Sequence, residues 1–126
     1  MSRWKPYNPN PKHNRVGDCT VRAICKATGQ DWETVYVGLC LYGFIDADMP
    51  SANHTWDRYL ERFGFDQKLV GRHAKIPYTV QDFCEDHPSG TFVLGCDGHV
   101  LTVVDGMYYD SWDSGGEIPI YYWERG

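Results

Sequence analysis

Apolar residues recur at helical spacing through the first two thirds of the chain and at strand spacing through the last third. The helical pattern predicts four helices, over residues 18–28, 31–43, 51–63 and 79–88. Residues that favour helix ends close these segments: Gly29, Gly43, Gly64 and Pro88. The part of the chain between residues 17 and 88 is therefore expected to be mainly helical.

After residue 90 the apolar spacing changes to the two-residue period of β-strands. Five strands are predicted in all: 65–70, 91–95, 99–104, 107–112 and 118–123. The dipeptides Asp97-Gly98 and Asp105-Gly106 are typical of hairpin turns between such strands. Helices followed by an antiparallel meander predict an α+β fold, in which N-terminal helices pack on a C-terminal antiparallel sheet.

The whole chain, residues 1–126, has the length of a single domain. Its first 16 residues are rich in Pro and Asn, and they predict an extended arm rather than a helix. The arm over 1–16, the mainly helical part over 17–88 and the antiparallel sheet over 90–124 make up the expected domain.

The composition argues against several classes of protein. The formal net charge is -5 and the Lys and Arg residues are scattered, so no nucleic-acid partner is expected. No apolar run is long enough to span a bilayer, and the start of the sequence lacks the apolar centre of a signal peptide. We therefore expect a cytoplasmic protein without a membrane partner. The cysteines, 5 in number, are expected to be reduced thiols rather than a disulfide scaffold.

Cys19 is the first candidate for chemistry. It follows Gly17 and Asp18, which predict a tight turn and a helix N-cap, so its thiol is expected in the first helical turn. The free backbone N–H groups and the positive end of the helix dipole favour a thiolate there. Arg22, one turn later, either supports that thiolate or is an ion-paired helix residue. On this stretch alone, Cys19 is either a nucleophile or an ordinary buried cysteine.

His99 and Asp110 are of the types that a thiol nucleophile needs as partners. His99 follows a hairpin turn and begins a strand, where its ring can face a cleft. The next hairpin returns Asp110 beside it, where a carboxylate would fix the imidazole tautomer and stabilise the imidazolium. Trp112, on the same strand face as Asp110, would shield the bond between them from water. Taken singly, the three residues also fit a surface histidine, a strand-end acid and a core aromatic.

The order of these residues resembles that of the papain-like cysteine peptidases. The matching pieces are Gly17-x-Cys19-x-x-x-Ala23, Gly98-His99-Val100 and Asp110-Ser111-Trp112. The last piece is similar to the Asn-Ser-Trp of papain, with Asp in place of Asn as in the bacteriocin-processing branch of the same fold. The whole chain also resembles small uncharacterised papain-like proteins of phages and gut bacteria.

The resemblance implies a papain-like fold and a hydrolase that cleaves an amide bond in a peptide or protein substrate. Cys19 would be the nucleophile, His99 the general base and acid, and Asp110 the residue that orients His99. The backbone N–H of Cys19 would form half of an oxyanion hole.

The other half of the oxyanion hole is where the sequence departs from the family. The family places a Gln side chain six residues before the nucleophile, and this chain has His13 there. The amide of Asn14, or of Asn10 if the Pro-rich arm folds back, is the expected replacement. If neither serves, the hole is weaker or built differently.

A zinc site is one alternative use of these residues. Cys84-x-x-His87 and Cys96-x-x-His99 have the ligand types and spacing of such a site. Each residue also fits a turn or the core, so no metal and no cofactor are expected.

Two further alternatives keep the fold and change the function. One is a catalytically idle module that holds a peptide or partner in an aromatic cleft. The other is an acyltransferase or transglutaminase-like enzyme, which shares the thiolate chemistry and differs in what resolves the acyl-enzyme. The presence of all three triad residues in the expected order favours a working enzyme, and it does not separate hydrolysis from transfer.

Overall fold

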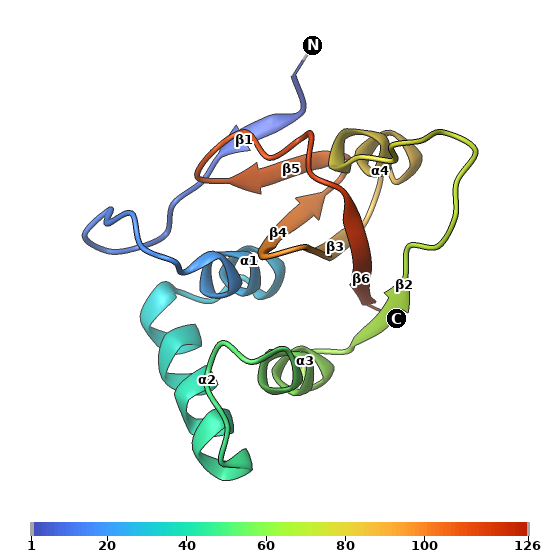
Figure 1. Cartoon of the computed structure of the whole chain (residues 1–126). Coiled ribbons are helices and arrows are strands. Elements are labelled where there is room, and N and C mark those ends of the chain that lie inside the picture. The colour runs from blue at the N-terminus through green and yellow to red at the C-terminus, as the bar shows by residue number, and fades with distance from the viewer. Residues whose placement is uncertain (1, 126) are drawn as a thin grey trace.

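The computed structural model describes residues 2–125, which form an α+β fold of four helices and a six-stranded mixed sheet (Figure 1). The helices are α1 Cys19–Thr28, α2 Trp32–Asp46, α3 Asn53–Glu61 and α4 Val80–Asp86. The strands are β1 Trp4–Pro6, β2 Phe65–Leu69, β3 Thr91–Cys96, β4 His99–Val104, β5 Met107–Asp110 and β6 Pro119–Arg125. Every predicted helix and strand is present, with ends that differ by a few residues.

The sheet differs from the predicted antiparallel meander in two strands. Its order is β1-β5-β4-β3-β6-β2, so β3, β4 and β5 form the expected meander. β1 lies within the segment predicted to be an extended arm, and it pairs in parallel with β5, which makes the sheet mixed. β6 does not pair with β5 but crosses the sheet to lie between β3 and β2. β1 occupies the outer edge of β5, so β6 extends the sheet at the free edge of β3.

Helices cover both faces of the sheet. On one face α1, α2 and α3 bury a cluster that includes Ile24, Leu39 and Val93. On the other face α4 packs against Leu94 and Leu101. Val93 and Leu94 are neighbours in β3 and enter opposite clusters, as the two-residue period of a strand buried on both sides requires. Within residues 2–125, no helix combines the length and the apolar character needed to cross a bilayer.

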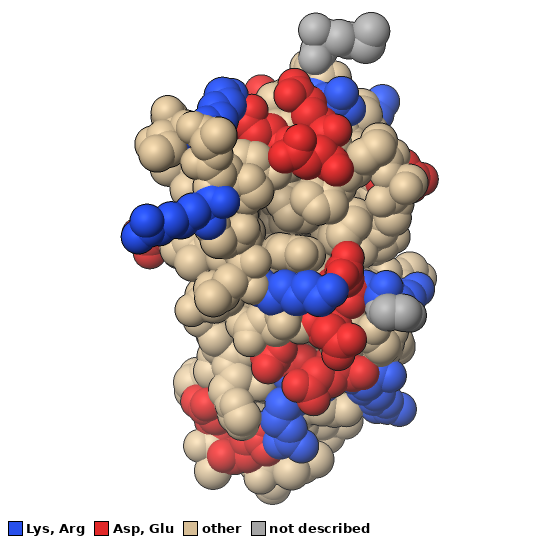
Figure 2. Space-filling view, turned by 90° about the vertical axis from the view of Figure 1, so that its right-hand side faces the viewer, with Lys and Arg blue, Asp and Glu red and all other residues tan. Residues whose placement is uncertain are grey.

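The surface carries charges of both signs. Figure 2 shows one face, on which acidic side chains gather into groups and Lys and Arg side chains lie singly between them. The cations are thus scattered on this face, as they are along the sequence.

Helix α2 runs past Gly43, where the sequence predicted its end. The helix continues to Asp46, and Ala47 follows it in the left-handed conformation with φ 55°. A Cβ atom built on Gly43 would lie 2.7 Å from the backbone oxygen of Asp48. The predicted helix end is therefore wrong, because the glycine is needed for the close approach of the following loop rather than for a cap.

We expect Gly43→Ala to destabilise the protein by about 1–3 kcal/mol through overpacking, although Ala is the better helix former by about 1 kcal/mol. The clash is with backbone, so the loop must move as a whole. Gly116→Ala is the control, because a Cβ atom built on Gly116 would meet nothing within 4 Å, so this variant should keep the unfolding midpoint of the wild type. Denaturant unfolding measures both, and equal midpoints for wild type and Gly43→Ala would contradict the prediction.

Candidate active site

Cys19 is the first residue of α1, but Asp18 does not cap this helix with its side chain. The Asp18 carboxylate accepts hydrogen bonds from the Arg22 guanidinium and, at 2.9 Å, from the Trp32 indole. Asp18 therefore occupies the predicted N-cap position, but its carboxylate binds Arg22 and Trp32 instead of a backbone N–H of the helix. The backbone N–H groups in the first turn of α1 therefore do not donate to the Asp18 side chain, and they lie next to Cys19.

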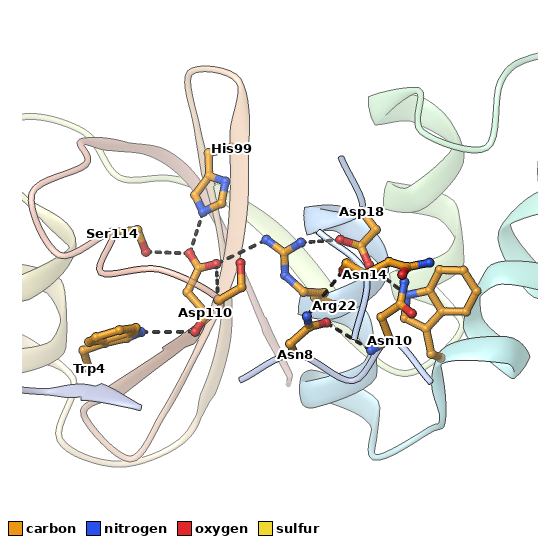
Figure 3. A network of polar contacts seen from close by, with 11 residues as sticks. Trp4, Asn8, Asn10, Asn14, Asp18, Arg22, His99, Asp110 and Ser114 are labelled. Atoms are coloured by element: carbon orange, nitrogen blue, oxygen red, sulfur yellow. Dashed lines mark hydrogen bonds and ion pairs between the residues drawn. The ribbon is translucent and has the colours of Figure 1, made fainter. Parts of the chain in front are cut away.

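His99 and Asp110 are joined directly. β4 begins at His99 and its antiparallel neighbour β5 ends at Asp110, so both residues lie at the same end of the sheet. His99 Nε2 lies 2.5 Å from Asp110 Oδ2 (Figure 3). Because Asp110 occupies Nε2, the other ring nitrogen, Nδ1, is the one available to Cys19.

Four donors surround the Asp110 carboxylate, which is 2 % exposed. In addition to His99, the Ser114 hydroxyl donates to Oδ2 at 2.6 Å. The other oxygen, Oδ1, accepts from the Ser111 backbone N–H at 2.8 Å and from Arg22 Nη2 at 3.3 Å. Since every partner donates, the site fits an ionised carboxylate that only accepts hydrogen bonds.

The N-terminal segment holds the backbone of Asp110. The indole N–H of Trp4 donates to the Asp110 carbonyl at 3.1 Å, and the backbone N–H of Tyr7 donates to the same oxygen at 2.8 Å. Pro6, in β1, is the register partner of Asp110 in β5. The main chain of Asp110 is therefore fixed by contacts distant in sequence, and its side chain by both near and distant partners.

Trp112 covers His99 from a position beyond the end of β5. Their ring centroids are 4.9 Å apart, and His99 is only 8 % exposed while Trp112 is 44 % exposed. The predicted strand through residue 112 is too long, because the Asp110 side chain binds the next backbone N–H and the chain turns there. Trp112 thus lies over the imidazole, as expected, but on a loop.

The pKa of the Cys19 thiol is lowered. Burial raises this pKa, but a hydrogen bond to His99, a backbone hydrogen bond from Val100 and the charges of His99 and Arg22 more than offset burial. Burial raises the pKa of three other thiols to about 12: Cys25, Cys84 and Cys96. Cys19 is thus distinguished from these thiols by its neighbours.

The imidazole and the carboxylate are both shifted towards their charged forms. Burial lowers the pKa of His99, but its bonds to Asp110 and Cys19 and their charges raise it to about 9. Burial raises the pKa of Asp110, but hydrogen bonds from His99 and Ser114 bring it below its usual value. All three shifts therefore favour the charged forms of the site: a thiolate, an imidazolium and a carboxylate.

Two cavities meet at Cys19 and His99, which line both of them. The larger, of about 600 Å³, has three aromatic residues in its wall: Trp56, Tyr121 and Trp123. The smaller, of about 350 Å³, includes three residues that precede the nucleophile: Asn8, Asn14 and Arg15. The thiol and the base therefore lie where an extended ligand can pass from one cavity to the other.

Of the two candidate oxyanion residues, Asn14 lines a cavity together with Cys19 and Asn10 does not. Asn14 lines the smaller cavity with Cys19. Asn10 is buried, its Oδ1 accepts from the Lys12 backbone N–H at 3.0 Å, and it lines a third cavity next to α2, which Asn14 also borders. Asn8, which the sequence did not single out, donates to the Asn14 carbonyl at 3.4 Å. Asn14 therefore stays the predicted amide donor, with Asn8 holding its backbone.

The residues of the alternative zinc site have other partners. His87 stacks on the Phe83 ring, and its Nδ1 lies 2.9 Å from the Phe83 carbonyl oxygen. Cys84 is fully buried in the core, and His99 contacts Asp110. In the part of the chain from residue 2 to residue 125, no group of three or more His, Cys, Asp or Glu is placed to hold a metal ion.

Comparisons with known proteins give no match to this chain among family models, curated proteins or solved structures.

Proposed function

We propose that the chain is a papain-like cysteine peptidase, a thiol hydrolase that cleaves amide bonds through Cys19, His99 and Asp110. The observation that carries the proposal is the position of His99, which contacts the Asp110 carboxylate through Nε2 and, with Cys19, lines both of the cavities that meet at the thiol. A nucleophile, a base and an orienting carboxylate in one line of contacts is the arrangement that activates a thiol. A helix that carries the nucleophile and a sheet that carries the base also support a papain-like fold.

In the proposed reaction the Cys19 thiolate attacks the amide carbon, a C–S bond forms and an electron pair moves onto the carbonyl oxygen. The backbone N–H of Cys19 and the amide of Asn14 stabilise that oxyanion. The His99 imidazolium gives its proton to the amide nitrogen, the C–N bond breaks and the amine leaves. A thioester on Cys19 remains.

The second half of the reaction uses water. Neutral His99 takes a proton from a water molecule, whose oxygen attacks the thioester carbon. The C–S bond breaks, the carboxylic acid product leaves, and Cys19 returns to thiolate beside an imidazolium. Asp110 holds the ring and stabilises its charged form through both halves.

The shape of the cleft supports a peptide as the substrate. The two cavities that join at Cys19 provide space for residues on both sides of the scissile bond. A module that only held a peptide would have no use for a thiol with a lowered pKa in contact with a histidine. This feature favours the hydrolase over the idle module.

A test of the activated nucleophile is alkylation with iodoacetamide at about pH 6. We expect Cys19 to be labelled ahead of the other four thiols, because only thiolates react and its pKa is lowered. Cys40 is the internal control, because it is a free thiol of similar partial exposure. Mass spectrometry of timed digests gives both rates, and Cys40 reacting as fast as Cys19 would contradict the proposal.

The pH dependence of the same reaction adds a second criterion. The pKa of His99 is raised to about 9, so the imidazolium is present below that pH and lost above it. Alkylation needs only the thiolate, so its rate should rise through the lowered pKa of Cys19 and not fall above pH 9. Amide hydrolysis also needs the imidazolium as general acid, so turnover should fall there.

A further inference from the structure

Arg22 is a buried cation between two buried carboxylates. Its Nη1 contacts the carboxylate of Asp18, and its Nη2 lies 3.3 Å from Asp110 Oδ1. Arg22 and Asp18 are each 7 % exposed and Asp110 is 2 % exposed. Figure 3 shows the guanidinium reaching from α1, where Asp18 precedes the nucleophile, to the end of β5.

The two carboxylates determine the orientation of this guanidinium. Its Nε is buried and has no hydrogen-bond partner, so Nη1 and Nη2 make its polar contacts with the described chain. Each carboxylate has a further donor on its far side, the Trp32 indole for Asp18 and His99 for Asp110. A continuous line of charge-assisted contacts therefore runs from the start of α1 to the imidazole.

We propose that Arg22 is a positioning residue of the proposed peptidase, which couples the helix that carries the nucleophile to the strand end that carries the carboxylate behind His99. This inference rests on the proposed function and deepens it. Arg22 touches neither substrate nor reacting atoms. Arg22 fixes Asp110 in the position from which Asp110 orients His99. It also offsets the negative charge of Asp18, the residue next to Cys19.

The charged and titratable groups that face Cys19 come from several elements. Those that influence its pKa or line the two cavities are Arg15, Arg22, Cys96, Asp97, His99 and Tyr121. Asp18 precedes Cys19 in the chain, and Asp110 lies behind His99. Among them Arg22 is the permanent cation of the buried line. Its removal leaves two buried acids against one imidazolium, which makes the thiolate harder to form. Removal of the Asp18 charge acts in the opposite direction.

The experiment is the pH profile of Cys19 alkylation in variants of the whole chain. The acid limb of this profile is the pH range in which the alkylation rate rises as Cys19 loses its proton. For Arg22→Gln we expect the acid limb to move to higher pH by about one unit, so that alkylation at pH values below the limb becomes about tenfold slower. For Asp18→Asn we expect the limb to move to lower pH. Arg22→Lys should recover part of the shift, because an ammonium restores the charge but not the two-nitrogen fork.

Thr102→Val is the matched structural control. The Thr102 hydroxyl donates to the Ala23 carbonyl at 2.6 Å, so this variant loosens α1 against β4 without changing a charge. The acid limb of Cys19 alkylation in Thr102→Val should stay at the pH of the wild type. A shift in Thr102→Val equal to that in Arg22→Gln would overturn the inference, because loosening alone would then explain both.

The remaining outcomes separate the inference from the proposed function. If wild-type Cys19 is labelled selectively but the acid limb of Arg22→Gln is unchanged, the role of Arg22 is overturned and the proposed peptidase function is not affected. If wild-type Cys19 is not selective, the proposed function itself fails. If Arg22→Gln does not fold, Asp18→Asn decides: a shift to lower pH supports the inference, and an unchanged limb overturns it.

Discussion

Cys19→Ala should abolish amide hydrolysis and leave the protein folded. Without the sulfur of Cys19 no thioester forms at this position. Cys96 lines the same cavity, but burial raises the pKa of its thiol to about 12, so we expect a loss of at least about 10⁴-fold in kcat/KM. Cys19 is half-buried at the start of a helix, where Ala is tolerated. The measurement is turnover of a fluorogenic peptide library, together with labelling by an electrophilic activity-based probe.

Cys40→Ala is the control for this loss. Cys40 lies in α2, is similarly exposed, and lines neither cavity at Cys19. It should keep the turnover and probe labelling of the wild type. Hydrolysis by Cys19→Ala at a rate near that of the Cys40 variant would show that another group carries the reaction.

Asp110→Asn should lower kcat/KM by about 10²–10⁴, even though papain has Asn at the matching position. An amide presents one donor and one acceptor, whereas all the partners of Asp110 donate. If its oxygen faces His99 and Ser114, its NH₂ faces Arg22 and the Ser111 N–H. If the amide flips, the NH₂ faces His99 and the tautomer with the proton on Nε2 is disfavoured. Either way the NH₂ group faces two donors, so at least one donor loses its partner.

The same variant should also be less stable, by about 1–3 kcal/mol, because a buried donor is left unsatisfied. Asp113→Asn is the matched control, since Asp113 accepts from the Tyr108 hydroxyl and from the Gly115 backbone N–H rather than from His99. It should keep near wild-type turnover. Peptide turnover and denaturant unfolding test both variants, and a fully active Asp110→Asn would show that His99 needs no carboxylate.

The pairing of His99 with Asp110 was predictable because short hairpin turns determine it. The Asp105-Gly106 turn is visible in the sequence, and its register places Val104 opposite Met107. Once that register is set, the start of β4 and the end of β5 must lie side by side. The position of Cys19 at a helix start was equally local, because turn residues precede it and apolar spacing follows it.

The features that the sequence did not predict depend on contacts between distant segments. The turn before β6 does not specify whether that strand pairs with β5 or crosses to β3, and the answer depends on β1 covering β5. Asp18 resembles a helix cap until Trp32, from another helix, and Arg22 compete for its carboxylate. The only feature of the sequence that could have indicated Ser114 as a donor to Asp110 is its position four residues later.

The hydrogen bonds that Trp4 and Tyr7 make to the Asp110 carbonyl have a consequence for when the chemistry can begin. Trp4 and Asp110 are 106 residues apart in the chain, so this bond closes only after nearly all of the sequence has been synthesised. The segment of helix α1 is synthesised before His99, so at that stage the Cys19 thiol has no imidazole beside it. The nascent chain therefore carries an unactivated cysteine. The proposed peptidase activity is therefore switched on by the completion of folding.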